Sequence, residues 1–509
     1  MLNREWKQFK SGTDIRGVAV EYKENKVNLT DEAVRAMAGG FVLWLSKKLD
    51  KSANELKISV GRDSRISGEH ILGICAEVMK ASGAEVLDCG LSSTPAMFMT
   101  TVDLACDGAL QITASHHPFY RNGLKFFTRS GGLESEDIEA ILQFAQDGKM
   151  PENAPNGSIT EYNYMQEYAA GLRETIKKAV NAEDYDKPLS GFKIVVDAGN
   201  GAGGFYASDV LEPLGADTNG SVYLEPDGMF PNHIPNPENE EAMASICSAV
   251  KRANADLGVI FDTDVDRGGA VDSSGNEINR NRLVAIAAAI ALEGNDGGLI
   301  VTDSITSSGL KDFIENELHG KHLRFKRGYK NVINEALRQN ALGVNCPLAI
   351  ETSGHAAMRE NYFLDDGAYL CTKIIIKLAQ LRKEGKNLES LLENLSEPLE
   401  SKEIRMNILE EDFRAYGEKV IASLTEYADK QPEFIVADDN HEGIRVSFDK
   451  DNGDGWFLLR LSVHDPIMPM NIESNSVGGV NIILKKLENF FKDFTKLDSS
   501  GISKALERG

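Results

Sequence analysis

The chain has 509 residues, too many for one hydrophobic core, and its hydrophobic content of 42% is that of an ordinary globular protein, so three or four domains are expected. The formal net charge of -23 argues against nucleic acid and anionic membranes as partners, and an anionic substrate would need a local group of arginines and lysines. Six scattered cysteines, an N-terminus without the apolar core of a signal peptide, and a longest apolar run of only residues 283–292 predict a cytoplasmic protein.

A strand, a polar turn rich in Gly or Ser and a helix follow one another in three parts of the chain. Such a series begins a βαβ unit, in which ligands collect at the carboxyl ends of the strands. The strands are expected at residues 56–60, 192–196 and 298–301, the turns at 61–65, 197–204 and 302–308, and the helices at about 71–79, through 210–211 and at 309–317.

A candidate nucleophile follows another predicted strand. Ser115 lies in Thr113-Ala-Ser-His-His-Pro118, and we expect it to be exposed on a turn where Pro118, Asn122 and Gly123 prevent immediate regular structure. A substrate could reach a serine placed in this way. For this segment alone, the alternative is a polar loop without a catalytic function.

Three carboxylates follow the buried strand predicted at residues 259–261, namely those of Asp262, Asp264 and Asp266. Like charges this close repel one another, and a cation between them would relieve the repulsion. Oxygen ligands favour a hard ion such as Mg²⁺, with a phosphate oxygen completing its shell. An EF-hand is excluded because Arg267 occupies the loop position that needs glycine. The alternative is a solvated acidic turn.

Changes in composition suggest the domain boundaries. We expect a loop at residues 147–158, a helix at 162–178, a charged helical stretch at 383–400, and C-terminal strands at 443–448 and 456–462. The predicted domains are residues 1–180, 181–295, 296–400 and 401–509. The glycine-rich turn at 199–204 fits neither a Walker loop nor a dinucleotide fingerprint, so we interpret it as structural.

Five motifs together resemble those of the α-D-phosphohexomutase family. The Ser115 segment with Asn122-Gly-Leu-Lys125 resembles its phosphoserine loop, and Asp262-Thr-Asp-Val-Asp-Arg267 resembles its metal loop. The resemblance covers about residues 11–475. It implies an α/β fold of four domains around a central cleft, in which three related α/β units with mixed sheets are followed by a C-terminal α+β domain. The other three motifs are Ser11-Gly-Thr-Asp-Ile-Arg-Gly17, Gly61-Arg-Asp-Ser-Arg65 and the sugar-specificity loop Glu351-Thr-Ser-Gly-His355.

The resemblance also implies an enzyme that interconverts the 1- and 6-phosphates of glucose or mannose. Ser115 would carry a phosphoryl group, and Mg²⁺ would bind that group together with the three aspartates. His116 and Arg267 would contact the phosphoserine. A hexose 1,6-bisphosphate would be both the intermediate and the activator, and a water-excluding cleft would protect it from hydrolysis.

Proton transfer and substrate binding involve further residues under the same resemblance. Lys125 and His355 are both candidates for the proton acceptor, and Arg16 would lower a lysine pKa or bind phosphate. A phosphosugar would be the partner, and the protein would be a monomer or a small homo-oligomer. The sugar would contact Glu351, Ser353 and His355, and its phosphate would contact Lys330, Arg460, Ser462 and His464.

The C-terminal phosphate loop departs from the family pattern. The family has Arg-x-Ser-Gly/Asn-Thr-x-Pro, whereas this chain has Arg460-Leu-Ser-Val-His-Asp-Pro466. His464 stands where a threonine hydroxyl is expected, and it can donate a hydrogen bond in the same place. The substitution suggests a divergent branch of the family.

Two alternative functions follow from the same residues. In a haloacid-dehalogenase-type phosphatase, Asp262 would be the nucleophile and Lys330 with Asp365-Asp366 would supply the later lysine and acidic pair. That pattern requires an apolar residue where this chain has Asp266. The altered loop at 460–466 suggests instead a non-catalytic sugar-phosphate-binding paralogue, but the intact Ser115 and the three aspartates argue against it.

Overall fold

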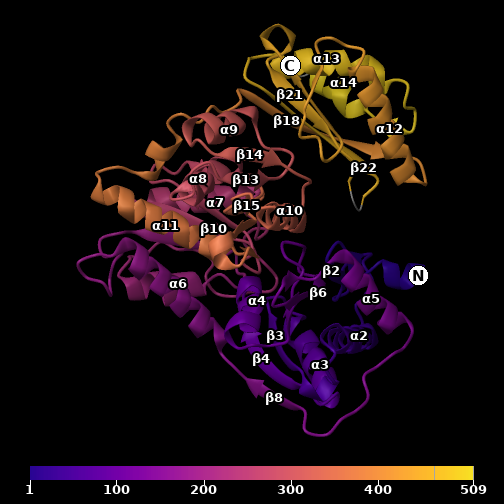
Figure 1. Ribbon diagram of the computed structural model, residues 1–509, viewed down its shortest axis with the longest axis vertical. Helices are drawn as coiled ribbons and strands as arrows, with labels where there is room; N and C mark the ends of the chain where they lie inside the picture. The colour runs from indigo at the N-terminus through magenta and orange to yellow at the C-terminus, as the bar shows by residue number, and fades with distance from the viewer. Residues whose placement is uncertain (463–464, 508–509) are drawn as a thin grey trace. The chain divides into compact units, whose positions relative to one another are not determined.

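The computed structural model describes residues 1–462 and 465–507 (Figure 1). The chain divides into two compact units. The first unit comprises residues 1–283 and 353–390, and the second comprises 284–352 and 391–509. In the described part of the chain, no helix combines the length and the apolar character that crossing a bilayer requires.

The first unit begins with an eight-stranded mixed sheet in the order β1-β2-β6-β5-β3-β4-β8, with β7 paired to β6. The pairs that link β5, β3, β4 and β8 are parallel, whereas β6 runs antiparallel to both β5 and β2. The strands are β1 (Lys10–Ser11), β2 (Asp14–Val18), β3 (Lys57–Arg62), β4 (Glu85–Leu91), β5 (Gly108–Ile112), β6 (Arg121–Thr128), β7 (Gly131–Gly132) and β8 (Ser158–Glu161).

Strand β6 contradicts the prediction that no regular structure immediately follows the Ser115 turn. Asn122 and Gly123 do not prevent regular structure, because they pair with Gly17 and Arg16 of β2 inside the sheet. Glycine is required at position 123 by close packing, since a Cβ atom there would lie 2.2 Å from the backbone oxygen of Ile15. The turn that carries Ser115 is therefore short and is bounded by strands on both sides.

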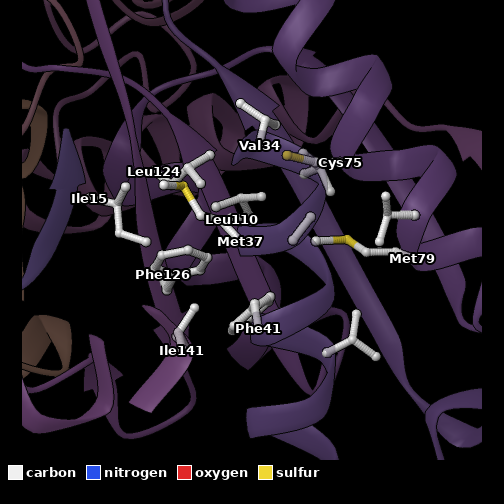
Figure 2. Packing of buried hydrophobic residues seen from close by; sticks show 14 of the residues in the cluster. Ile15, Val34, Met37, Phe41, Cys75, Met79, Leu110, Leu124, Phe126 and Ile141 are labelled. Carbon is white, nitrogen blue, oxygen red and sulfur yellow. The ribbon is translucent and has the colours of Figure 1, made fainter. Parts of the chain in front are cut away.

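Helices α2 (Asp31–Leu49) and α3 (Gly68–Ala81) supply much of the core beside this sheet (Figure 2). Thr30 caps the N-terminus of α2, its hydroxyl accepting a hydrogen bond from Ala33 N, and two acidic residues occupy the first turn of the helix. Buried side chains of this kind each contribute about 1.5–3 kcal/mol. The other helices of this region are α1 (Arg4–Lys7), α4 (Thr94–Asp103), α5 (Ser135–Gln146) and the 3₁₀ turn η1 (Ala53–Glu55).

The first unit contains a second sheet in the order β12-β11-β10-β9. Every residue of β9, β10 and β11 is buried, which agrees with their apolar sequences except at Asp197, and β10 runs parallel to β9. The strands are β9 (Ile194–Asp197), β10 (Leu257–Phe261), β11 (Gly268–Val271) and β12 (Glu277–Ile278), and an antiparallel pair β16 (Ala356–Met358) and β17 (Leu364–Asp365) belongs to the same unit. The helices are α6 (Tyr164–Val180), η2 (Tyr206–Leu211), η3 (Glu212–Leu214), α7 (Glu240–Ala253), η5 (Arg359–Asn361) and α11 (Gly367–Lys383).

The second unit contains a parallel set of strands and an antiparallel sheet. The parallel strands are β14 (Lys321–Arg324), β13 (Leu299–Thr302) and β15 (Leu348–Ile350), with α9 (Ser308–Asp312), η4 (Phe313–Glu317) and α10 (Tyr329–Ala341). The antiparallel strands are, in spatial order, β19 (Ile435–Val436), β20 (Ile444–Phe448), β21 (Gly455–Leu459), β22 (Ile467–Ser474), β18 (Glu400–Ile408) and β23 (Leu497–Asp498). Their helices are α12 (Phe413–Ala428), α13 (Gly479–Phe491) and α14 (Ser500–Glu507), and η7 (Lys450–Asn452) lies in the β20–β21 turn.

These sheets confirm the expected fold of three α/β parts followed by a C-terminal α+β part. The boundaries proposed at residues 180, 295 and 400 stay predictions. Helix α8 (Arg280–Leu292) contains, in sequence, the boundary between the two compact units.

The helical stretch expected at residues 383–400 is wrong. Helix α11 ends at Lys383, only the 3₁₀ turn η6 (Leu388–Leu392) follows, and β18 begins at Glu400. Gly385 has a φ of 72°, a left-handed conformation that ends the helix, and Pro398 excludes a helix just before the strand. The prediction of a helix at residues 383–400 relied on the charged residues of this segment, which do not form one.

Helix α11 begins at a buried carboxylate. Asp366 accepts hydrogen bonds from the Tyr168 hydroxyl of α6 at 2.7 Å, from Asn361 Nδ2 at 3.1 Å and from the backbone of Tyr369 at 2.8 Å. Burial raises the pKa of Asp366 to about 6 despite these donors. The ionised Asp366 carboxylate therefore lowers the free energy of unfolding, and this effect grows as the pH rises.

We expect Asp366→Asn to remove a pH dependence of stability. Because the folded-state pKa lies above the ordinary value of 3.8, the stability associated with protonated Asp366 is complete below that value and is lost as the pH rises through about 6. Between pH 5 and pH 8 the wild-type protein should lose about 1.4 kcal/mol of unfolding free energy relative to the variant. Urea unfolding of both proteins at the two pH values measures this, and parallel changes would contradict it.

Candidate active site

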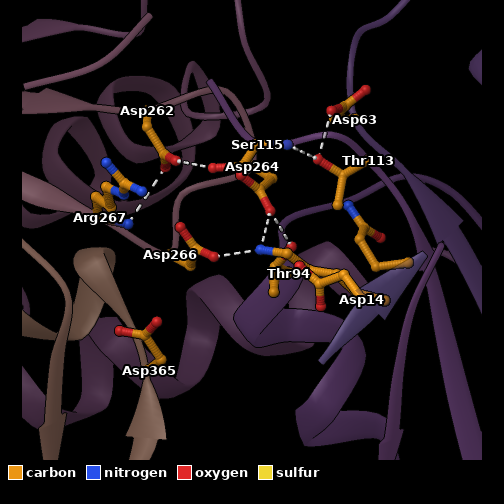
Figure 3. Close-up of polar contacts among 12 residues, drawn as sticks. Asp14, Asp63, Thr94, Thr113, Ser115, Asp262, Asp264, Asp266, Arg267 and Asp365 are labelled. Carbon is orange, nitrogen blue, oxygen red and sulfur yellow. Dashed lines mark hydrogen bonds and ion pairs between the residues drawn. The ribbon is translucent and has the colours of Figure 1, made fainter. Parts of the chain in front are cut away.

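Ser115 lies in the turn between β5 and β6 with a φ of 52°, a left-handed conformation that is unusual for a serine. Its backbone N–H donates to Thr113 Oγ1 at 2.9 Å, and Thr113 Oγ1 donates to Asp63 Oδ2 at 2.7 Å (Figure 3). The expectation that Ser115 is exposed is wrong, because its relative exposure is only 2%. Its hydroxyl instead donates to Asp262 Oδ2 at 3.2 Å, inside the group of aspartates.

A buried arginine fixes the Ser115 turn. The side chain of Arg65 is only 1% exposed and forms an ion pair with Asp63 at 3.1 Å. Its two terminal nitrogens donate to four backbone carbonyls of the turn, which explains how a strained residue is held in place. These carbonyls belong to Pro118 and Arg121, both at 2.9 Å, His117 at 2.7 Å, and Ser115.

Replacing Arg65 by methionine should lower the unfolding free energy by about 3–5 kcal/mol, because it leaves Asp63 as a buried unpaired charge and removes the donors for the turn. Urea unfolding followed by fluorescence measures the change. The exposed Arg129 provides the control, and Arg129→Met should change stability by less than about 0.5 kcal/mol. Equal effects of the two substitutions would contradict the role given to Arg65.

The three predicted metal ligands lie together at the end of β10. Asp262, Asp264 and Asp266 are buried, and one carboxylate oxygen from each lies within 4.8 Å of the others. Among the described residues, nothing hydrogen-bonds Asp264 Oδ1 or Asp266 Oδ1 although both are buried. Burial, followed by the repulsion of the other two aspartates, raises the pKa of Asp262. This donor set fits a hard divalent cation such as Mg²⁺.

Lys125 and Thr94 contact the same carboxylates. Lys125 Nζ donates to Asp264 Oδ2 at 2.9 Å and to Asp266, and its residue is only 3% exposed. The Thr94 hydroxyl donates to Asp264 Oδ2 at 2.5 Å, and the Thr94 backbone N–H donates to the Asp264 carbonyl at 2.8 Å. Thr94 was not predicted from the sequence, because its only local signal is its place before Pro95 at the start of α4.

His355 is paired on both sides of its ring. Its Nδ1 lies 2.5 Å from Asp365 Oδ2, and Arg267 Nε donates to its Nε2 at 2.8 Å. Because Arg267 can only donate, His355 Nε2 accepts and Nδ1 carries the proton that faces Asp365. The Asp365 carboxylate raises the pKa of His355 despite its burial. Asp365, which sequence analysis considered only for the phosphatase, therefore orients His355. Arg267 also contacts Asp262, since its backbone N–H donates to Asp262 Oδ1 at 3.2 Å.

His116 and Arg16 complete the group in the first unit. His116 Nδ1 lies 3.2 Å from Ser115 Oγ. Burial, followed by the charge of Arg267, lowers the pKa of His116 far below its ordinary range, so its ring is neutral. Arg16 pairs with Asp14 at 3.0 Å, and its buried Nε has no hydrogen-bond partner among the described residues. Ser353 is also buried, at 3% exposure.

The predicted substrate residues Glu351, Lys330, Arg460 and Ser462 belong to the second unit. Glu351 is 3% exposed, and its Oε1 accepts a hydrogen bond from Gly328 N at 2.6 Å. In the described part of the second unit, no group hydrogen-bonds the buried Nε of Arg460. Ser462 Oγ accepts from Asp465 N at 3.3 Å, and His464 lies outside the described residues.

Three family models match successive parts of this chain. They describe phosphoglucomutase/phosphomannomutase α/β/α domains I, II and III and match residues 8–151, 166–275 and 279–399. A phosphomannomutase/phosphoglucomutase of Pseudomonas syringae pv. tomato is 31% identical over 437 residues, which are 85% of this chain and 87% of that protein. A phosphoglucomutase/phosphomannomutase of Thermococcus kodakarensis is 33% identical over 424 residues, which are 82% of this chain and 86% of that protein.

A crystal structure shows the same fold over nearly the whole chain. It is that of a phosphoglucomutase/phosphomannomutase family protein from Burkholderia thailandensis, with a TM-score of 0.78 and 24% sequence identity. The match covers 98% of this chain and 100% of that chain.

Proposed function

The chain belongs to the phosphoglucomutase/phosphomannomutase family of α-D-phosphohexomutases and is a hexose phosphate mutase, and we propose that it works through a phosphoserine at Ser115 and a hexose 1,6-bisphosphate. The substrates are the 1- and 6-phosphates of glucose, mannose or both. The observation that carries this proposal is the hydroxyl of Ser115, which donates at 3.2 Å to Asp262 in a buried group of three carboxylates.

In the proposed first step, a sugar hydroxyl oxygen attacks the phosphorus on Ser115, the bond from phosphorus to Ser115 Oγ breaks, and the hydroxyl proton leaves. Lys125 or His355 would accept this proton; Lys125 Nζ donates to Asp264 and Asp266, and both ring nitrogens of His355 also have partners. The resulting bisphosphate then reverses its orientation relative to Ser115. Its other phosphoryl group is transferred to Ser115 by the reverse of the first step. Arg16, His116 and Arg267 steady the phosphoryl oxygens.

Asp262, Asp264 and Asp266 would hold Mg²⁺ together with an oxygen on Ser115. When bound, the ion would neutralise charge on the transferring phosphoryl group. The hexose 1,6-bisphosphate would also act as the activator, because it phosphorylates Ser115 in enzyme that has lost its phosphate.

Six further residues would recognise the substrate. Glu351, Ser353 and His355 would bind the sugar hydroxyls, and Arg460, Ser462 and Lys330 would bind the phosphate. His464 belongs to the same proposed phosphate loop. A cytoplasmic location and a monomer or small homo-oligomer complete the proposal. The relatives are mutases, so neither the phosphatase nor the non-catalytic paralogue is favoured.

Tandem mass spectrometry after incubation with glucose 1,6-bisphosphate and Mg²⁺ tests the proposal directly. We expect one added phosphoryl group, on Ser115. A base-labile adduct on Asp262 would indicate the phosphatase instead, and the absence of any adduct would indicate the binding paralogue.

A further inference from the structure

Two adjacent backbone amides at the start of α10 are bound by carboxylates from different parts of the second unit. The N–H of Arg327 donates to Glu442 Oε2 at 3.0 Å, and the N–H of Gly328 donates to Glu351 Oε1 at 2.6 Å. Glu442 lies between β19 and β20 of the antiparallel sheet, whereas Glu351 follows β15. The peptide that positions Glu351 is therefore itself bound by the C-terminal part of the chain.

Glu442 also binds the turn after β13. The same Oε2 accepts a hydrogen bond from Ser304 Oγ at 2.7 Å. The preceding residue, Asp303, accepts from the hydroxyl of Thr352 at 2.7 Å, and Thr352 follows Glu351 directly. One carboxylate oxygen thus contacts both turns that lie beside Glu351, and a charged acceptor strengthens each of these bonds.

The segment around Glu442 contacts β21, the strand that ends directly before Arg460. Arg445 donates from Nη1 to the Ser304 carbonyl at 3.0 Å, and its guanidinium lies 3.5 Å from the ring centroid of Trp456 in β21. Strand β21 ends at Leu459, directly before Arg460. An ion pair from Arg324 Nε to Asp439 at 3.0 Å holds the same segment near the end of β14.

We propose that Glu442 is a positioning residue that makes sugar recognition by Glu351 depend on the C-terminal sheet that carries Arg460 and Ser462. This rests on the proposed function, in which Glu351 binds the sugar and the other two residues bind its phosphate. Without the carboxylate, the Arg327 amide and the Ser304 hydroxyl lose an acceptor. Gly328, with a φ of 117° and no side chain, then allows the backbone beside Glu351 to move.

The kinetic test compares Glu442→Ala and Glu442→Gln with a control, Glu426→Ala, at an exposed position of α12. With glucose 1-phosphate, glucose 1,6-bisphosphate and Mg²⁺, Glu442→Ala should raise KM about tenfold and change kcat less than about threefold. Glu442→Gln should recover most of the loss, because its amide oxygen accepts the same bonds. A fall in kcat at constant KM, or no recovery in the glutamine variant, would overturn the proposal.

Hydrogen exchange tests the same link without activity. In Glu442→Ala, the amides of residues 327–329 should exchange at least about tenfold faster, whereas those of β13 should keep their wild-type rates. Unchanged exchange at 327–329 would refute the positioning role. If the wild-type protein shows no mutase activity but this exchange difference appears, the proposed function fails while the structural link between Glu442 and the Glu351 turn is confirmed.

Discussion

Replacing Ser115 by alanine should abolish the mutase reaction, lowering kcat/KM by about 10⁴-fold or more. The variant loses the side-chain oxygen that carries the phosphoryl group in the proposed mechanism. Stability should change little, because the hydroxyl contributes a hydrogen bond to Asp262 and a contact with His116 Nδ1, both at 3.2 Å, and the Arg65 contacts that hold the turn involve backbone oxygens. A coupled assay for glucose 6-phosphate formation measures the loss, with circular dichroism to confirm folding.

The exposed Ser130 provides the matched control, and Ser130→Ala should keep wild-type activity and the phosphate on Ser115. If Ser115→Ala retained more than a few per cent of wild-type turnover, the phosphoryl group would have to be carried elsewhere. The proposed mechanism would then be wrong, although membership of the family would stand.

The second large loss of activity is expected when Asp262 of the proposed Mg²⁺ site is replaced. Asp262→Asn keeps the shape of the side chain and an acceptor for the Arg267 amide but removes one negative charge from the proposed Mg²⁺ site. We expect Mg²⁺ affinity to fall at least about tenfold and kcat/KM to fall roughly 10³-fold. Calorimetric titration of the protein with MgCl₂ reports on binding independently of turnover.

The exposed Asp296 is the control for this change, and Asp296→Asn should leave both quantities unaltered. Chelation of the wild-type protein with EDTA should likewise remove activity, and added Mg²⁺ should restore it. Normal turnover by Asp262→Asn would show that the three aspartates are not the metal site.

Much of this site was predictable because its residues directly follow the ends of buried strands. The apolar run of β10 stops directly before Asp262, and β5 stops before the turn of Ser115. Both β5 and β10 run parallel to a neighbouring strand, which places functional residues at their carboxyl ends. The family resemblance then paired two segments 147 residues apart, which no local pattern could do.

The residues that sequence analysis missed act through distant contacts. Thr94 has an ordinary place at a helix start, yet it binds Asp264 170 residues later. Arg65 belonged to a matched motif, but its four carbonyl contacts depend on how the turn folds. Glu442 lies in a polar segment without a recognisable motif. Such roles follow from tertiary packing, and side-chain chemistry alone does not specify them.

The glycine-rich segment at 199–204 binds no group in the proposed mechanism, but it should tolerate almost no variation. A Cβ atom on Gly201 would lie 2.7 Å from the Thr263 carbonyl oxygen and 2.8 Å from its Cα. The next residue, Ala202, donates a backbone hydrogen bond to the same carbonyl at 2.8 Å. Thr263 lies between Asp262 and Asp264 in the sequence, so any side chain at position 201 would displace these two aspartates. In a saturation mutagenesis screen for activity, Gly201 would therefore score like a reacting residue, although it has no part in the proposed mechanism.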